Sequence, residues 1–240
     1  MNRIPQDTMQ TTPSIHLNLQ TLHGTQATAA ALDNLVIAGW TGRNQQAMEE
    51  HIAELEAMGI ARPATTPIYY QVATSRLTKA DRIEVSGDGS SGEAEFVLAQ
   101  IGGRLWVGVG SDHTDRKLET MGVALSKQIC EKPIGDTFWA FDEVAPHWDQ
   151  LVLRSYIIED GQRTLYQEGP VTTMRDPLEL VAGWTAGEAA LPEGSMMFCG
   201  TLAAIGRIRT AGHFEMELHD PVLQRTLRHG YAIRTLPIAG

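Results

Sequence analysis

The 240-residue sequence is poor in cysteine and in basic side chains, and it contains no long apolar run. Its two cysteines, Cys130 and Cys199, stand far apart and outside any Cys-x-x-Cys pattern, which argues against a disulfide framework and a zinc ribbon. There are 19 Lys and Arg against 29 Asp and Glu, so the formal net charge is -10. This acidic balance argues against a nucleic-acid partner.

The chain also lacks the patterns that direct a protein into a membrane. No stretch approaches the roughly 18 consecutive apolar residues that a membrane-spanning helix needs. Residues 1–20 contain no apolar core of a signal peptide. Cysteines outside a disulfide framework are typical of a reducing compartment. We therefore expect a cytoplasmic protein with no membrane partner.

Apolar and polar residues alternate over much of the chain, with the period of a half-buried strand. This pattern predicts strands at residues 14–22, 68–77, 80–87, 93–101 and 104–112, and a strand that enters a loop at residues 33–44. Strands and loops dominate after residue 150. A helical period is confined to residues 44–59, 114–128 and 176–184. The pattern predicts an α+β, β-rich fold with a few peripheral helices. A flexible tail at residues 1–12 would precede a single domain at residues 13–240.

Two glutamates, Glu93 and Glu95, stand one residue apart where the chain otherwise resembles a strand. Alternate residues of a strand point to the same side, so two unpaired carboxylates there would repel each other and raise each other's pKa. A divalent cation would remove that cost, and carboxylate oxygens suit Mg²⁺, Mn²⁺ or Ca²⁺. A hairpin at Gly102–Gly103 would bring Asp112 beside them, with His113 alternating outward. The commoner fate of such a pair is a solvated acidic face.

A second group of chemical interest lies on the helix predicted at residues 44–59. His51 and Glu54 are three residues apart, so they neighbour each other on the helix surface at the border of the apolar stripe. A His beside a carboxylate is a general acid–base arrangement, because the pKa of His lies near neutral pH. The simpler interpretation is an exposed His–Glu pair that stabilises the helix slightly.

Six segments, in the same order, resemble the fumarylacetoacetate hydrolase superfamily, and the likeness runs from about Val36 to the C-terminus. They are GRNQQAMEEHIAEL (42–55), GEAEFVLAQIG (92–102), VGVGSDHTDR (107–116), LSKQICEKPIGDTF (125–138), YQEGPVTTM (166–174) and LPEGSMMFCGT (191–201). The fourth resembles a Lys-Ser/Pro-hydrophobic-Gly region of the family. The resemblance implies a mixed β-roll or sandwich of the superfamily's C-terminal domain type, assembled as a homodimer or a higher oligomer.

The resemblance also implies a set of site residues. The metal ligands would be Glu93, Glu95 and Asp112, holding Mg²⁺ or Mn²⁺. The catalytic residues would be His51, Glu54 and Lys127, with the first two on a helix that orders over the substrate. The substrate carboxylate and oxygens would contact Arg43, Asn44, Arg116, Gly200 and Thr201.

The implied activity is hydrolysis of a carbon–carbon bond in a small 2-oxo or diketo acid, such as an acylpyruvate. The bound metal would stabilise an enolate, and His51 with Glu54 would activate the attacking water. A decarboxylase, hydratase or isomerase would use the same site, so the sequence leaves these reactions open. A non-catalytic member that binds a small acid is a third alternative.

Overall fold

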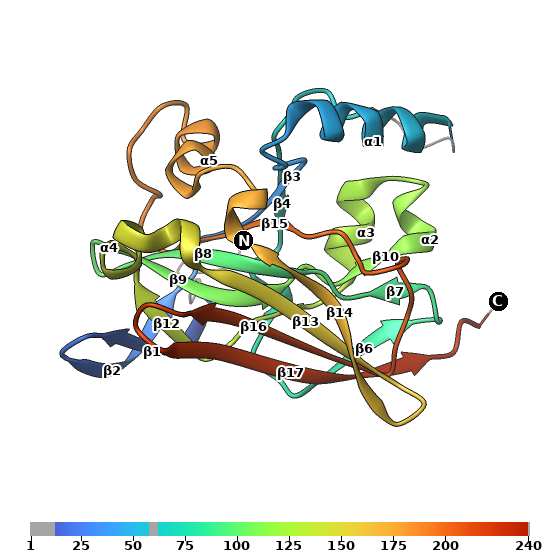
Figure 1. Ribbon diagram of the computed structural model, residues 1–240. Coiled ribbons are helices and arrows are strands. Elements are labelled where there is room, and N and C mark those ends of the chain that lie inside the picture. The colour runs from blue at the N-terminus through green and yellow to red at the C-terminus, as the bar shows by residue number, and fades with distance from the viewer. Residues whose placement is uncertain (1–12, 58–61, 240) are drawn as a thin grey trace, which may run out of the picture.

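The computed structural model describes residues 13–57 and 62–239 (Figure 1). The tail expected at residues 1–12 and the helix end expected at Gly59 lie outside these ranges. In the described ranges no helix is both long and apolar enough to cross a membrane.

The larger sheet has eight strands in the order β2-β1-β12-β9-β8-β15-β3-β4. It is mixed, because β1 with β12 and β15 with β3 are parallel while the other neighbours are antiparallel. In chain order its strands are β1 Ser14–Thr21, β2 Gly24–Ala31, β3 Asn34–Gly39, β4 Ile68–Val72, β8 Ala94–Ile101, β9 Arg104–Ser111, β12 Thr137–Ala140 and β15 Ser195–Thr201.

The second sheet has five strands in the order β14-β13-β16-β17-β6, and only the β17–β6 pair is parallel. Its strands are β6 Arg82–Ser86, β13 Val152–Glu159, β14 Gln162–Pro170, β16 His213–Asp220 and β17 Arg225–Leu236. Two short ribbons complete the β-structure, formed by β7 Ser90–Ser91 with β10 Thr114–Asp115 and by β5 Leu77–Thr78 with β11 Lys132–Pro133.

Helices are few and lie outside the sheets, with α1 and α5 along the upper side of Figure 1. The α-helices are α1 Gln45–Ala57, α2 Arg116–Glu119, α3 Val123–Ile129, α4 Phe141–Val144 and α5 Pro177–Trp184. Within the described residues, three short 3₁₀-helices lie at Thr74–Arg76, Ala145–Gln150 and Val171–Thr173. The expectation of a β-rich fold with few helices is confirmed.

Strand β8 is buried along its whole length because it lies between two apolar clusters. Phe96 and Leu98 pack in the cluster between the two large sheets, which also receives Phe214 from β16. Val97 and Ala99 pack in the cluster on the opposite face of the larger sheet. This explains why the four residues that follow Glu95 are all apolar, and it places the carboxylate-bearing end of β8 next to the protein interior.

Two local predictions differ from the structure. The helix predicted at residues 114–128 is divided into α2 and α3 by Thr120–Gly122, and Asp115 caps α2 by accepting from the N–H groups of Lys117 and Leu118. Strand β2 was not predicted, because its sequence GTQATAAA is mostly exposed and lacks the alternating large apolar residues of a half-buried strand.

Candidate active site

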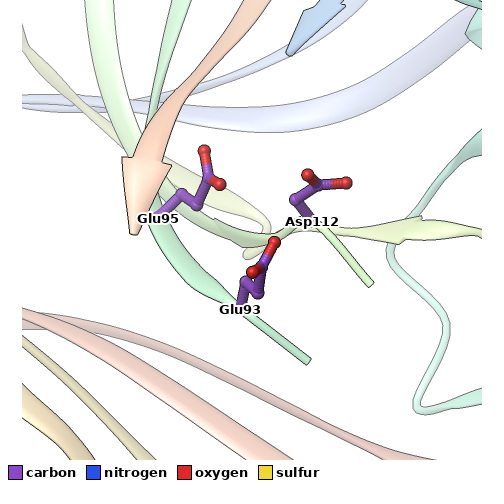
Figure 2. A group of neighbouring side chains, drawn as sticks. All are labelled: Glu93, Glu95 and Asp112. Carbon is purple, nitrogen blue, oxygen red and sulfur yellow. The ribbon is translucent and has the colours of Figure 1, made fainter. Parts of the chain in front are cut away.

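The pairing of β8 with β9 brings the three acidic residues together. Ala94 lies opposite Ser111 in this hairpin, and beyond the strand ends the Asp112 N–H donates to the Glu93 carbonyl oxygen at 3.0 Å. One carboxylate oxygen each from Glu93, Glu95 and Asp112 lies within 4.8 Å of the other two. Figure 2 shows the three side chains grouped at this end of the strands. The structure thus brings together the residues that the sequence predicted to be neighbours.

Burial makes this grouping costly if all three groups are ionised. Glu95 is 2% exposed and Asp112 is 0% exposed. At this separation two unit charges repel by roughly 3–4 kcal/mol, taking an effective dielectric constant of about 20. Burial, together with the charges of Asp112 and Glu93, raises the pKa of Glu95 well above its usual value. Without a further cation, the site therefore favours the protonated form of Glu95.

Two lysines hold Asp112 in its ionised form. The Lys127 ammonium donates to Asp112 Oδ2, and Lys132 Nζ lies 3.1 Å from Asp112 Oδ1. Burial alone would raise the pKa of Asp112, but the positive charges of Lys127 and Lys132 outweigh it and lower this pKa to about 2. Lys132 is completely buried and donates a hydrogen bond to the His113 carbonyl oxygen at 2.6 Å.

Arg116, which the resemblance makes a substrate contact, is engaged with the protein's own carboxylates. Its Nη2 lies 3.0 Å from Glu93 Oε1 and its Nη1 lies 3.1 Å from Glu119 Oε2, while Nε donates to Ser91 Oγ at 2.8 Å. Together with Lys127 and Lys132, Arg116 relieves part of the repulsion within the acidic group. A metal ion is therefore not the only positive charge available to these carboxylates, which the sequence pattern alone did not indicate.

The residues nevertheless fit a hard divalent cation. The three side chains offer only carboxylate oxygens, the ligands that Mg²⁺ and Mn²⁺ prefer. Asp112 Oδ1 is buried and accepts no hydrogen bond from the described residues, although Lys132 is close to it. An oxygen of this kind retains lone pairs for a cation.

Glu93 and Glu95 line a cavity of about 620 Å³. Arg116 and Lys127 also line it, and so do Asn44, Gly200 and Thr201. Much of the remaining wall is apolar or aromatic, with contributions from Trp40, Met48, Tyr70, Val123 and Ile208. A small organic acid fits such a space, which combines charged and polar groups with apolar side chains.

The turn at Gly200–Thr201 is attached directly to the acidic group. The Gly200 N–H donates to Glu95 Oε2 at 2.7 Å. Gly200 has a φ of +99°, and an added Cβ would lie 1.8 Å from Thr41 Oγ1, so only glycine brings the backbone this close. Thr201 Oγ1 donates to the Ala94 carbonyl oxygen at 2.7 Å, so its hydroxyl proton is used within the protein.

Gln167 is a residue of the site that the sequence did not single out. Its Oε1 accepts from the Ala94 N–H at 3.1 Å and from Ser155 Oγ at 2.7 Å. Its Nε2 donates to Thr201 Oγ1 at 2.8 Å and to the Leu202 carbonyl oxygen at 2.6 Å. Gln167 thereby joins β8, which carries Glu95, to the Gly200–Thr201 turn. The segment YQEGPVTTM, one of the six that carry the resemblance, was the available signal.

The predicted site residues near α1 differ in their position relative to the cavity. Asn44 caps the helix, because its Oδ1 accepts from the Ala47 N–H at 3.1 Å, and it lines the cavity. Arg43 is exposed and does not line the cavity. The backbone of α1 carries His51 and Glu54, but their side chains lie outside the described part of the structure. Their proposed roles stay predictions.

Two residues next to the acidic group differ from the sequence expectations. His113 was expected to alternate outward, which is wrong: it is fully buried, and its ring hydrogen-bonds Ser90 Oγ at 2.9 Å and Tyr231 Oη at 3.0 Å. The β7–β10 ribbon supplies Ser90 and encloses this ring. Burial, with the charges of Lys132 and Arg116, lowers the pKa of His113 to about 3. Lys132 itself was missed, although Lys-Pro-Ile-Gly at residues 132–135 matches the Lys-Ser/Pro-hydrophobic-Gly region directly.

Solved structures with the same fold confirm the resemblance. A fumarylacetoacetate hydrolase family protein from yeast superposes with a TM-score of 0.59 at 16% identity, covering 87% of this chain and 95% of its own. A protein described as a candidate fumarylpyruvate hydrolase from Burkholderia cenocepacia gives 0.62 at 16% identity, covering 99% and 97%. A 2-keto-3-deoxy-D-arabinonate dehydratase, complexed with magnesium and 2,5-dioxopentanoate, gives 0.61 at 17% identity, covering 88% and 77%. The chain thus shares the fold of these fumarylacetoacetate hydrolase family structures at low sequence identity.

A match to one sequence family is more specific. Residues 38–231 match the family described as "Protein of unknown function (DUF2848)", and the chain belongs to that family. No curated protein matches the chain by sequence.

Proposed function

We propose that the protein is a divalent-metal-dependent hydrolase that cleaves a carbon–carbon bond in a small 2-oxo or diketo acid, such as an acylpyruvate. The observation that carries this proposal is the convergence of three carboxylates within 4.8 Å, with Glu93 and Glu95 in the wall of a cavity of about 620 Å³. The descriptions of two proteins with the same fold, a candidate fumarylpyruvate hydrolase and a magnesium-bound dehydratase, support the same class of substrate.

Glu93, Glu95 and Asp112 would hold Mg²⁺ or Mn²⁺, and the bound ion would serve as a Lewis acid toward the oxygens of the oxo acid. Lys127 would place positive charge beside the oxygen that becomes negative in the reaction. Asn44 through its side-chain amide and Thr201 through its backbone N–H, both in the cavity wall, would orient the substrate carboxylate.

Water would be activated from the side of α1. This helix starts next to Asn44 at the cavity, and we propose that His51 takes a proton from water with the help of Glu54. The hydroxide adds to the acyl carbonyl carbon, the bond to the pyruvate methylene carbon breaks, and the proton returns to that carbon. One water is consumed, and one carboxylic acid and one pyruvate are released.

A dehydratase is the second candidate, because one structure with this fold is a 2-keto-3-deoxy acid dehydratase. The same cavity without a water beside His51 would also support decarboxylation or isomerisation. These reactions would start from the same bound oxo acid and differ in the product that they release.

The test is a product assay on acylpyruvates, oxaloacetate and 2-keto-3-deoxy acids, with and without Mg²⁺ or Mn²⁺. We expect metal-dependent release of pyruvate from an acylpyruvate. Glu95→Gln should lose metal binding and turnover together, since an amide is a weaker ligand than a carboxylate. Glu84→Gln, a substitution of an exposed glutamate paired with Arg234, is the matched control and should change neither. Equal activity of Glu95→Gln and the unchanged protein would refute the metal assignment.

A further inference from the structure

Lys127 occupies the space beside two of the candidate metal ligands. We propose that it is a tethered counter-ion that competes with the divalent cation for Asp112 and Glu93, and that it is released into the cavity when the cation binds. This inference rests on the proposed function, because it concerns the same three carboxylates.

The contacts of Lys127 place its ammonium group within the acidic cluster. Lys127 lies on α3, which packs against β10 and β4, and its Nζ donates to Asp112 Oδ2. The same Nζ lies 3.8 Å from Glu93 Oε2. A divalent ion that takes oxygens from both residues has to share them with this ammonium or displace it.

Lys132, the other lysine at Asp112, can be compared with Lys127. Both lysines contact Asp112, but Lys132 has no exposed surface, donates to the His113 carbonyl oxygen and does not line the cavity. Lys127 does line the cavity, so its flexible four-carbon stem has adjacent space into which the ammonium can move. Lys132 is therefore a fixed counter-charge, and Lys127 is a movable one.

The cavity also offers the displaced ammonium a place to stay. The ring of Tyr70 lines the cavity and lies 5.9 Å from Lys127 Nζ, within the range of a cation–π contact. From there the ammonium faces the substrate space instead of Asp112. The charge that assists the reaction would thus reach the substrate only in the metal-loaded protein, which couples metal binding to activation.

The sign of the effect on affinity follows from reciprocity. If the ammonium and the cation oppose each other at the same carboxylates, removing the ammonium strengthens cation binding. Coupling of this kind changes affinity by about 5–150-fold, so Lys127→Met should bind Mn²⁺ at least about fivefold more tightly than the unchanged protein. A lysine that only helped to hold the ligands in place would produce the opposite change.

Isothermal titration with Mn²⁺ alone tests this inference. Lys117→Met is the matched control, because Lys117 is an exposed lysine paired with Asp88 outside the cluster. The affinity of this variant for Mn²⁺ should equal that of the unchanged protein. Lys127→Gln replaces Lys127→Met if the latter does not fold. Equal or weaker binding by the Lys127 variant overturns the inference alone. If the unchanged protein and the variant are folded and neither binds Mn²⁺, the proposed function fails as well.

Amine labelling provides a second readout that is independent of activity. Reductive methylation followed by mass spectrometry should show Lys127 reacting faster, by several-fold, when Mn²⁺ is present. Lys132 should stay unreactive in both conditions and serves as the internal control. Lys127 labelling that is unchanged or slower with Mn²⁺ would contradict the proposed release.

Discussion

Charged side chains occur in two contrasting arrangements in this fold, at the carboxylate-bearing end of β8 and β9 and across the second sheet. In the second sheet, exposed acidic groups pair with an arginine of a neighbouring strand, as with Glu168 and Arg154 at 2.6 Å or Glu84 and Arg234 at 2.6 Å. At the end of β8 and β9 the acidic and basic groups are buried or half-buried and share partners. Lys127 and Lys132 both contact Asp112, and Arg116 contacts Glu93.

The difference lies in hydration more than in residue type. An exposed ion pair contributes roughly 0–1 kcal/mol, because water already solvates both partners. Buried carboxylates have lost that water, so each depends on the charges beside it, and their pKa values diverge as those of Glu95 and Asp112 do. Divergent pKa values in a cavity are characteristic of sites that perform chemistry.

The largest effect should come from removing the shared partner of the buried group. Asp112→Asn leaves Lys127 and Lys132 without their main counter-charge, and loss of one partner from a buried pair costs about 3–5 kcal/mol. We expect the free energy of unfolding in urea, without metal, to fall by about this amount. A loss below about 1 kcal/mol would mean that water reaches these lysines and that the two arrangements do not differ as described.

A pH series should show an intermediate effect with a definite sign. The folded-state pKa of Glu95 is raised, so its contribution to stability is present below its unfolded pKa near 4.5 and is lost as the pH rises through the folded value. Asp112 acts in the opposite direction, but only as the pH falls toward about 2. Between pH 4.5 and the folded pKa of Glu95, the free energy of unfolding of the metal-free protein should fall by up to about 1.4 kcal/mol per pH unit.

Urea unfolding of the unchanged protein and of Glu95→Gln, both without metal and at several pH values above 4.5, measures this slope. The substitution should remove it, since an amide does not titrate. Identical slopes in the two proteins would show that Glu95 ionises as freely as a surface glutamate.

The smallest effect is expected in the second sheet. Glu84→Gln breaks an exposed pair with Arg234, and the free energy of unfolding should change by no more than about 0.5 kcal/mol. Thermal or urea unfolding against the unchanged protein measures the difference. A change as large as that of Asp112→Asn would remove the distinction between the two arrangements.

The acidic group was predictable from the sequence because a single hairpin forms it. Glu93, Glu95 and Asp112 lie within 20 consecutive residues, and strand alternation with a Gly-Gly turn sets their register. Most strands were predictable for the same reason, since local alternation reveals them. The contacts of Gln167 were not, because they join segments 73 and 34 residues apart, and no local pattern reports such a distance.

The contacts around the acidic group could not be predicted, because they depend on how distant segments pack together in the folded chain. The burial of His113 requires the β7–β10 ribbon and Tyr231 of β17, which converge only in the folded chain. The two lysines on Asp112 depend on where α3 and β11 lie. Arg43 and Asn44 are adjacent in the sequence, yet only the second lines the cavity, because Asn44 caps α1 and Arg43 remains outside.

Strand β8 is bonded on one edge to β9 and on the other to β15, so the carboxylates at its end are attached to the most constrained part of the larger sheet. Other parts of the cavity wall, such as Met48 on α1 and Ile208 after β15, come from segments outside both sheets. Changes in those segments can alter the shape of the acid that fits without shifting the ligand oxygens. The architecture therefore lets substrate choice diverge among related proteins while the charged centre keeps its geometry.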